Sequence, residues 1–192
     1  MENSKDKRKK RKWLNYVLNG LFLIIILILI IPSWRQSFQT WFTELTLSDA
    51  AFSKTEKVTM PLEQRDWELI SPDGTLYNFA EFEGKPIVLN FWGTWCPACN
   101  AEFPSLGRLR ENFDNEVVFI AVTTESLGVL ENSGYPEKYD FLYCTQHFPA
   151  FFEVNSFPTL CILDKEMNLV YKKIGAAVLD TQENITFLRG LL

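Results

Sequence analysis

A strand-length apolar run that leads into two closely spaced cysteines constrains this chain most. The run is Ile87–Phe91, and Cys96 and Cys99 follow it after a short connection. Pro97 suits the first turn of a helix, where no backbone N–H is needed. The stretch Asn90–Cys99 therefore predicts the end of a buried strand, a tight turn, and a helix with two thiols in its first turn. A Cys-x-x-Cys pair at such a junction indicates thiol redox chemistry.

The two thiols are expected to differ in reactivity because they occupy different positions in that helix. Cys96 falls at the helix N-terminus, where unpaired backbone N–H groups and the helix dipole favour the thiolate. Cys99 lies on the same face but deeper. We expect Cys96 to attack a substrate disulfide as the nucleophile and Cys99 to resolve the mixed disulfide. Trp95 is expected to form an apolar wall beside the Cys96 sulfur.

The N-terminal part of the chain has the composition of a membrane anchor. Residues 1–12 carry seven Lys and Arg and two acidic residues, a net charge of +5, whereas the whole chain has a net charge of −5. Leu14–Ile31 then runs for 18 residues without a charge, and as a helix it would be about 27 Å long, close to a hydrocarbon core of about 30 Å. This pattern predicts a basic cytoplasmic tip at 1–12 and a transmembrane signal-anchor helix at 13–32, with the rest outside.

A cleaved signal peptide is the competing interpretation of the same segment. Its cleavage site requires small residues, and the nearest candidate, Ile31-Pro32-Ser33, has a bulky residue where a small one is needed. The sequence therefore favours an uncleaved anchor. The basic charge lies at one tip of an otherwise acidic chain, which argues against nucleic-acid binding, since that function needs basic charge over the folded part.

The segment 33–60 is expected to connect the anchor to a folded domain. Its large apolar residues recur at the spacing of one helix face; they are Trp34, Phe38, Trp41, Phe42 and Leu45. Two interpretations remain open: a helix in the membrane interface, or a stalk that packs on the domain. The chain becomes polar from 48 to 60, which indicates a linker.

The remaining residues alternate between strand and helix signals. A short strand is expected at 67–70, and a second short strand that runs into a helical turn is expected over 76–82. Central strands are expected at 87–91 and 117–122, a further strand at 139–144, and a hairpin of strands at 159–163 and 169–174. Helices are expected at 97–113, near 126–132 and at 180–192, with a helical turn at 148–154. The order βαβαβ followed by ββα predicts an α/β fold with a mixed sheet flanked by helices.

The motif and this element order resemble the thioredoxin superfamily. Trp-Cys-Pro-Ala-Cys is similar to its active site, and Asn-Phe-Trp-Gly-Thr-Trp-Cys is similar to the TlpA/ResA-like membrane-anchored branch. The resemblance covers roughly Met60–Leu192 and implies a thioredoxin-like domain at 61–192. It also implies a cis peptide bond before Pro158, which would present the Phe157 backbone to a peptide as a short strand. Trp95, Pro97, Phe157 and Pro158 are the expected substrate-binding residues.

Two positions depart from thioredoxin itself. The buried Asp of thioredoxins is replaced by Asn90, which cannot move a proton. Glu102 lies one helical turn after Cys99, an offset at which the TlpA/ResA-like branch also carries Glu. Glu102 is therefore the candidate proton acceptor for Cys99, with a pKa raised by burial, and an exposed helix residue is the alternative. The dipeptide Pro97-Ala98 leaves the reduction potential open.

Two more cysteines, Cys144 and Cys161, fall in or beside predicted strands. They are compatible with buried inert thiols, a structural disulfide or an accessory redox pair. A zinc site built from all four cysteines would need a second close pair, which the sequence lacks.

The resemblance implies a membrane-tethered thiol-disulfide oxidoreductase in the cytoplasmic membrane of a bacterium, with its catalytic domain on the periplasmic side. Its expected role is to reduce disulfides of exported proteins, with apocytochrome c as one client. A membrane electron donor of the DsbD/CcdA kind would reduce its Cys96–Cys99 disulfide after each reaction. The chemistry needs no bound cofactor. The alternatives are a disulfide-donating oxidase or isomerase, a thiol peroxidase and a non-catalytic binding tether. A peroxiredoxin motif requires Thr and Pro at the positions that Gly93 and Leu89 occupy here, so this motif is absent and the thiol peroxidase has no support from it.

Overall fold

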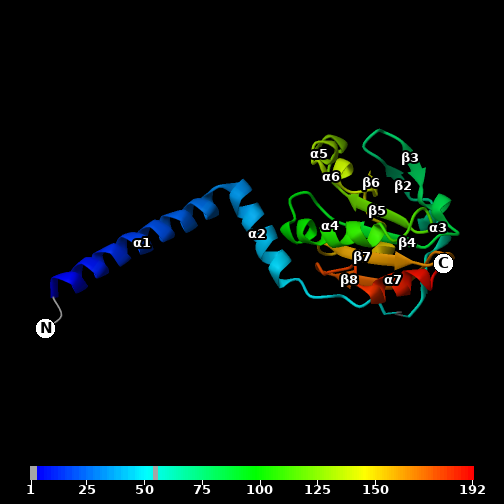
Figure 1. The fold of residues 1–192 in the computed structure, drawn as a ribbon. Helices are drawn as coiled ribbons and strands as arrows, with labels where there is room; N and C mark the ends of the chain where they lie inside the picture. The colour runs from blue at the N-terminus through cyan, green and yellow to red at the C-terminus, as the bar shows by residue number, and fades with distance from the viewer. Residues whose placement is uncertain (1–3, 54–55) are drawn as a thin grey trace.

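A mixed β-sheet forms the centre of the molecule (Figure 1). The structure, a computed structural model, describes residues 4–53 and 56–192. In the described residues the sheet has eight strands in the order β1-β8-β7-β4-β5-β6-β2-β3. This sheet agrees with the α/β class and the thioredoxin-like order that the sequence predicts.

The central strands are mostly apolar because both faces of the sheet are covered, and their few polar residues, such as Asn90 of β4, are buried as well. Strand β4 (Ile87–Phe91) pairs in parallel with β5 (Val118–Thr123), which pairs in parallel with β6 (Leu142–Thr145). On its other side β4 pairs antiparallel with β7 (Thr159–Leu163), and β7 forms the predicted hairpin with β8 (Asn168–Ile174). The Cys-x-x-Cys motif follows β4, so it starts at the carboxyl edge of a central strand.

Short strands extend both edges of this sheet. At one edge β1 (Val58–Thr59) pairs antiparallel with β8. At the other edge β2 (Glu68–Ile70) pairs with β6 and with β3 (Leu76–Asn78), both antiparallel. Strands β2 and β3 agree with the predicted pair, but β1 was not predicted because a two-residue strand has no periodicity.

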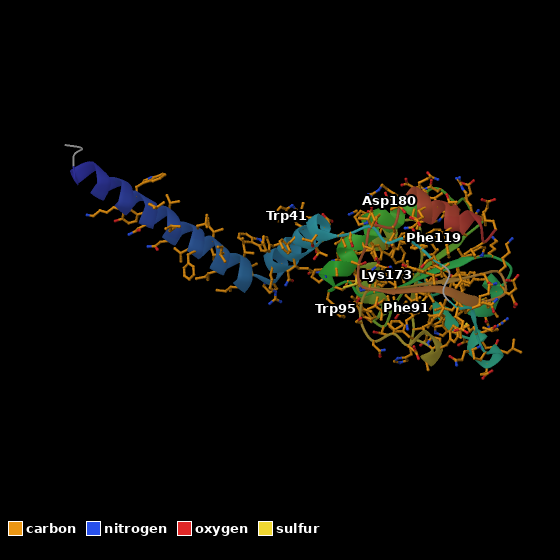
Figure 2. The ribbon with its side chains drawn as sticks, turned by 90° about the horizontal axis from the view of Figure 1, so that it is seen from below. Trp41, Phe91, Trp95, Phe119, Lys173 and Asp180 are labelled. Atoms are coloured by element: carbon orange, nitrogen blue, oxygen red, sulfur yellow. A yellow bond between two sulfur atoms is a disulfide. The ribbon has the colours of Figure 1, made fainter. Side chains whose placement is uncertain are left out.

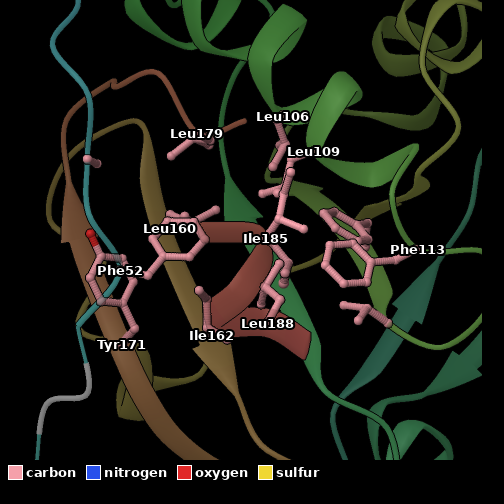
Figure 3. Packing of buried hydrophobic residues seen from close by; sticks show 14 of the residues in the cluster. Phe52, Leu106, Leu109, Phe113, Leu160, Ile162, Tyr171, Leu179, Ile185 and Leu188 are labelled. Carbon is pink, nitrogen blue, oxygen red and sulfur yellow. The ribbon is translucent and has the colours of Figure 1, made fainter. Parts of the chain in front are cut away.

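Two helices, α4 (Pro97–Arg110) and α7 (Gln182–Arg189), cover one face of the sheet (Figure 3). Alternate residues of the strands point to this face, and they pack against leucine and isoleucine side chains of both helices. The buried residues on this face include Val88, Leu106, Leu109, Phe113, Leu160, Ile162, Ile185 and Leu188. This packing fixes α4, and with it the cysteines at its N-terminus.

The other face of the sheet is covered by an aromatic cluster. Phe79 comes from η1 (Phe79–Phe82), Phe152 comes from η2 (Ala150–Phe152), and Trp67 follows the short helix α3 (Leu62–Arg65). The rings of Trp67, Phe79, Phe91 and Phe152 contact one another there, with centroids 5.2 to 6.4 Å apart.

The insertion between β5 and β6 holds two short helices, α5 (Leu127–Glu131) and α6 (Tyr135–Lys138). The sequence predicts a helix near α5 and then a strand from Tyr139, but it does not predict α6, which lies between them, and β6 starts only at Leu142. Tyr139 does not join the sheet because its ring packs on Phe103 of α4, 5.5 Å between centroids.

The predicted anchor is a bent pair of helices. Helix α1 (Ser4–Ile30) includes the basic run, and α2 (Pro32–Thr46) follows after a break at Ile31. Pro32 causes the break, since a residue before proline disfavours the helical conformation and Ile31 is extended. In the described residues, no single helix reaches the length and hydropathy of a membrane span. The segments Lys12–Ile28 and Pro32–Thr46 reach it together, bent by 100°. The sequence prediction of one helix over 13–32 therefore did not anticipate the bend.

Helix α2 packs on the folded body beside α4, but with its polar side. Gln36, Thr40 and Thr43 are half-buried and share one face of α2. The predicted apolar face lies opposite them, and its five large side chains are 47% to 65% exposed. The stalk therefore packs on the body and exposes an apolar face at the same time, so the two interpretations of this segment are not exclusive.

The segment 48–60, which the sequence predicts to be a linker, is instead partly built into the core. Ala50, Phe52 and Met60 are buried. Asn184 of α7 holds this segment: its Nδ2 donates to the Ala50 carbonyl at 2.6 Å, and its Oδ1 accepts from the Phe52 N–H at 2.7 Å. The folded body therefore begins before the predicted boundary at residue 61, because isolated apolar residues in a polar stretch give no periodic signal.

Candidate active site

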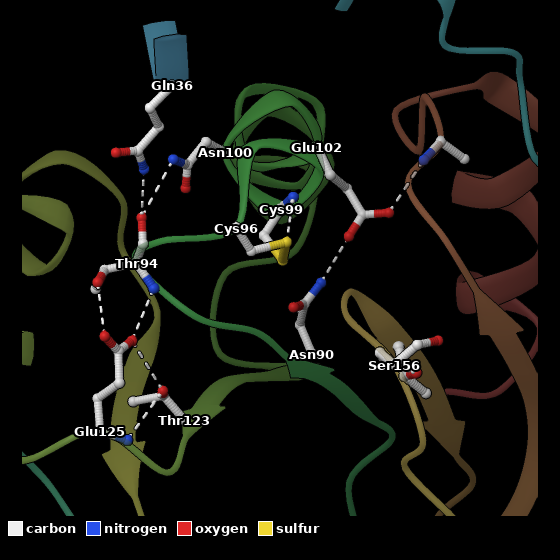
Figure 4. Close-up of a disulfide and its surroundings, with 12 residues drawn as sticks. Gln36, Asn90, Thr94, Cys96, Cys99, Asn100, Glu102, Thr123, Glu125 and Ser156 are labelled. Carbon is white, nitrogen blue, oxygen red and sulfur yellow. Dashed lines mark hydrogen bonds between the residues drawn. A yellow bond between two sulfur atoms is a disulfide. The ribbon is translucent and has the colours of Figure 1, made fainter. Parts of the chain in front are cut away.

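Cys96 and Cys99 form a disulfide at the start of α4 (Figure 4). Cys96 is the N-cap residue, and its Sγ accepts a hydrogen bond from the Cys99 N–H at 3.1 Å. This contact places the Cys96 sulfur at an unpaired donor of the helix N-terminus, as the sequence predicts. Cys96 is 5% exposed and Cys99 is fully buried. Cys96 is therefore the more accessible thiol and Cys99 the deeper one.

The turn before Cys96 is held by a carboxylate that the sequence analysis missed. Glu125 accepts from the Thr94 N–H and from the Thr94 hydroxyl, each at 2.7 Å, and from the Thr123 hydroxyl at 3.2 Å. Glu125 comes just after β5, which runs parallel to β4. The carboxyl ends of adjacent parallel strands lie at the same edge of a sheet. A polar residue just after Val118–Thr123 is therefore expected near the turn that follows β4, and this position is the sequence signal for Glu125.

The carbonyl of Thr94 is held from the opposite side. It accepts from Asn100 Nδ2 of α4 at 3.3 Å and from Gln36 Nε2 of α2 at 3.0 Å. Gln36 belongs to the predicted stalk. The spacing of the apolar residues in that segment does not indicate that Gln36 contacts the site. Both peptide groups flanking Thr94 are thereby fixed, which orients the backbone that leads into Cys96.

An apolar surface surrounds the disulfide. Trp95 is 61% exposed, and its ring lies 5.8 Å from that of Phe157. The Phe157–Pro158 bond is cis, as the resemblance implies. Gly93 lets the Trp95 ring lie over the turn, since a Cβ there would come within 2.8 Å of the indole nitrogen. The exposed Trp95 side chain is visible in Figure 2 at the end of the body that faces α2.

A pocket of about 220 Å³ opens beside Trp95 and Phe157 and is lined further by Phe148, Val154, Asn155 and Ser156. Pro97 is half-exposed on the other side of Cys96, and Pro158 is buried. The structure therefore brings three of the four predicted substrate-binding residues to the surface near the disulfide. It keeps Pro158 buried.

Glu102 is fully buried one helical turn after Cys99, so the alternative of an exposed helix residue is wrong. Its Oε2 accepts from Asn90 Nδ2 at 2.8 Å, and its Oε1 accepts from the Ala177 N–H at 3.2 Å. Burial raises the pKa of Glu102 to about 7, and the two hydrogen bonds oppose that rise. A carboxyl with such a pKa can bind or release a proton near neutral pH.

Cys144 and Cys161 are free, buried thiols. Cys144 lies on β6 and Cys161 on β7, with β4 and β5 between them. Three strand spacings of about 4.8 Å separate them, whereas a disulfide requires Cα atoms no more than about 7 Å apart. Burial raises the pKa of both thiols to about 12. They are therefore inert thiols, and a disulfide or redox pair between them is excluded.

Known proteins resemble this chain in sequence. Residues 51–185 match the Redoxin family. The thiol-disulfide oxidoreductase ResA of Bacillus cereus is 24% identical over 160 residues, 81% of this chain and 87% of that protein. The thioredoxin-like protein YneN of Bacillus subtilis is 29% identical over 107 residues, 53% of this chain and 63% of that protein. The thiol:disulfide interchange protein DsbE of Pseudomonas aeruginosa is 56% identical over 32 residues, 17% of this chain and 18% of that protein.

Solved structures show the same fold. A secreted disulfide oxidoreductase of Mycobacterium tuberculosis, homologous to DsbE of E. coli, superposes with a TM-score of 0.56 at 23% identity and covers 69% of this chain and 100% of that one. StoA of Bacillus subtilis superposes with a TM-score of 0.52 at 19% identity and covers 62% of this chain and 95% of that one. The chain therefore belongs to the Redoxin family, and within the thioredoxin superfamily it is a TlpA/ResA-like thiol-disulfide oxidoreductase.

Proposed function

We propose that this chain is a membrane-tethered reductase that breaks disulfides in exported proteins. The observation that carries the proposal is the hydrogen bond from the Cys99 N–H to Cys96 Sγ. A sulfur at the N-terminus of a helix is stabilised as the thiolate, which is the attacking species in disulfide exchange. Cys96 is the nucleophile and Cys99 the resolving thiol.

The reaction proceeds in two exchanges that move two electrons from the chain to its client. The Cys96 thiolate bonds to one client sulfur, the client S–S bond breaks, and the other client sulfur leaves as a thiolate. Cys99 then gives its proton to Glu102, and its thiolate bonds to Cys96 Sγ. The mixed disulfide breaks, the second client sulfur leaves, and the chain is left with the Cys96–Cys99 disulfide.

The client polypeptide is held by the apolar surface around Cys96. Trp95 and Pro97 contact its side chains, and the Phe157 backbone next to Pro158 pairs with it as a short strand. The pocket beside Trp95 and Phe157 accepts an apolar client side chain, since aromatic rings form much of its wall.

The tether is the apolar part of α1, with the basic tip in the cytoplasm and the folded body on the outer side of the bacterial cytoplasmic membrane. The uncharged run from Leu14 to Ile31 and the preceding basic run support this topology. In this arrangement the tip is 1–12, the anchor is 13–32 and the stalk is α2, while the thioredoxin-like body also includes the buried residues Ala50, Phe52 and Met60.

The clients are exported proteins, with apocytochrome c as one of them, and a membrane electron donor of the DsbD/CcdA kind returns the two electrons. Both assignments rest on the resemblance to the TlpA/ResA-like branch. A reductase requires a Cys96–Cys99 potential near the thioredoxin value of about −270 mV, whereas a value near −120 mV would indicate the disulfide-donating alternative. Equilibration of the full chain with glutathione buffers measures it.

A trapping experiment tests the proposed roles. A Cys99→Ser chain should accumulate mixed disulfides between Cys96 and its clients, because the resolving thiol is missing. The matched Cys96→Ser chain should accumulate none, since Cys99 is buried. Captured exported proteins, identified by mass spectrometry, would support the proposal. Equal capture by both variants would contradict the assignment of the nucleophile.

A further inference from the structure

Helix α2 buries its polar side and exposes its apolar side. Gln36, Thr40 and Thr43 face the body. The large apolar side chains share the opposite face and stay exposed; they are Trp34, Phe38, Trp41, Phe42 and Leu45. A helix on the surface of a soluble protein normally buries its apolar stripe against the core. The aromatic face of α2, defined by these five residues, is therefore shaped for contact with something outside the folded body.

The same helix is attached to the active site. Gln36 donates to the Thr94 carbonyl at 3.0 Å, two residues before Cys96. A groove of about 340 Å³ lies between α2 and the start of α4, where Phe38 and Phe42 face Pro97 and Ala98. The orientation of α2 therefore determines what the Cys96 side of the body faces.

The surroundings of α2 identify a phospholipid surface as the occupant of its aromatic face. Tryptophan and phenylalanine are the residues with which interfacial helices enter the headgroup layer. The uncharged run Leu14–Ile31 leads directly into α2, and the two helices meet at 100°. If α1 follows the membrane normal, α2 then lies close to the membrane plane.

The two views of the ribbon agree on the side at which the membrane would lie. Helix α1 and the folded body lie on opposite sides of α2 in both (Figures 1 and 2). The aromatic face is exposed on the side of α2 opposite its half-buried polar residues, which is the side on which α1 leaves, and Phe38 and Phe42 form its edge beside Pro97 and Ala98. Lipid contact by α1 and by the aromatic face is therefore geometrically compatible.

We infer that α2 lies in the headgroup layer of the membrane, with its aromatic face in lipid and its polar face against the folded body. This placement holds Cys96 at the membrane surface. The partner that fits this placement is a membrane-embedded or membrane-bound polypeptide that exposes its cysteines within the headgroup layer. This inference rests on the proposed function of a membrane-tethered oxidoreductase and adds where its partners must present their sulfur atoms.

The placement of Cys96 at the membrane surface can be tested with lipid-anchored peptides whose disulfides lie at different distances from the membrane. The full chain is reconstituted in vesicles of equal parts phosphatidylcholine and phosphatidylglycerol, and it is reduced before use. Two anchored peptides carry the same disulfide, one on a short and one on a long Gly/Ser linker. We expect the short-linker peptide to react faster by about tenfold, because the effective concentration is highest where the reach matches the site.

The variant Trp34→Gln/Trp41→Gln/Leu45→Gln removes the centre of the aromatic face and keeps α1. It should lose the short-linker preference and reduce the same peptide without an anchor at the unchanged rate. Leu62→Gln/Leu76→Gln, which removes two exposed apolar side chains elsewhere on the body, should keep the preference. A preference that survives the triple substitution, or faster reaction of the long-linker peptide with the unsubstituted chain, would overturn the inference.

Fluorescence quenching tests the placement without thiol chemistry. Phospholipids brominated near the headgroup should quench the unsubstituted chain more strongly than the Trp34→Phe/Trp41→Phe chain, since those two indoles lie in lipid. Equal quenching would overturn the placement of α2, as would cross-linking that shows a second copy on the aromatic face. If quenching occurs as expected but no peptide is reduced, the proposed function fails, and with it the assigned partner.

Discussion

A buried carboxyl and a buried amide share one hydrogen bond beneath the disulfide. Glu102 accepts from Asn90 Nδ2, while Asn90 Oδ1 has no partner among the described residues. If the Asn90 side-chain amide rotates by 180°, its Oδ1 takes the place of Nδ2 and can accept a hydrogen bond from protonated Glu102. Asn90 can therefore bond to Glu102 in either protonation state of the carboxyl. This explains how a carboxyl with a pKa of about 7 is accommodated in the core.

The first prediction concerns Glu102→Gln. Folded Glu102 has a pKa of about 7 and keeps its proton up to about that pH, whereas the ordinary pKa of a Glu carboxyl is 4.5. The folded chain therefore binds more protons than the unfolded chain in this window, and its stability falls as pH rises through it. The loss is about 3 kcal/mol, at 1.36 kcal/mol per pKa unit. Gln stays neutral, so the variant should lack this loss.

Thermal unfolding of the oxidised chain between pH 5 and 8, followed by circular dichroism, measures the effect. The melting temperature of Glu102→Gln relative to the unsubstituted chain should rise with pH by roughly 6 to 12 °C. Glu111→Gln, at the exposed end of the same helix, is the control and should show no such rise. A difference that is constant across the pH range would contradict a raised pKa at Glu102.

The two remaining cysteines give a second prediction. Because Cys144 and Cys161 are buried and burial raises the pKa of each to about 12, neither should react with iodoacetamide in the folded, oxidised chain. Denaturant without reductant should expose two reactive thiols, and denaturant with reductant should expose four, counted by mass. Labelling of the folded chain, or no labelling in denaturant alone, would contradict this account.

At the residue scale the sequence identified those side chains whose position follows from local spacing. Cys96, Cys99 and Glu102 lie on one helix, so their relative placement needed only the helical repeat. Glu125 and Gln36 hold the same turn from distant segments. No local pattern encodes such contacts, because they depend on which strand ends and which helix face the fold brings together.

At the element scale, the junction between the stalk and the body depends on one buried amide. Asn184 donates to the carbonyls of Ala50 and Leu179 and accepts from the Phe52 N–H. Asn184→Ala would leave these buried groups without a partner, which should lower stability by about 3 kcal/mol. We expect the melting temperature to fall by roughly 6 to 12 °C.

Thr186→Ala serves as the control, since Thr186 is exposed on the same helix and its hydroxyl donates to the Gln182 carbonyl within that helix. It should change stability by less than about 0.5 kcal/mol. Equal melting temperatures for Asn184→Ala and the unsubstituted chain would show that segment 50–52 does not need this amide. Limited proteolysis should also cut the Asn184→Ala chain faster near residue 52.

Elements with a clear period or a continuous apolar run were predictable, and short ones were not. Strands β4, β5 and β7 each place alternate apolar residues on two covered faces, which makes them nearly continuous apolar runs with one polar residue each. Helix α6 and strand β1 are too short to show a period, and they form because tertiary contacts fix them. The bend follows from a local signal, Pro32. That signal lies at the end of a long uncharged run, which by itself predicts one straight membrane helix.

At the scale of the whole molecule, the chain combines a basic tip, an apolar helix and an acidic body. Residues 13–192 sum to −10, since the tip contributes +5 to a total of −5. The proposed topology depends on this asymmetry, because Lys and Arg next to an apolar helix keep their side of it in the cytoplasm. The acidic body does not oppose export, since acidic residues contribute little to orientation.

Replacement of the seven Lys and Arg residues of segment 5–12 by Gln should therefore disturb the topology without altering the body. Protease added to spheroplasts should digest the body of the unsubstituted chain, and should leave a protected fraction of the variant because part of it no longer crosses the membrane. Lys85→Gln/Arg189→Gln, which neutralises exposed charges on the body, should be digested like the unsubstituted chain. Complete digestion of both variants would mean that the basic tip does not set the orientation, and protection of the unsubstituted chain would contradict an external catalytic domain.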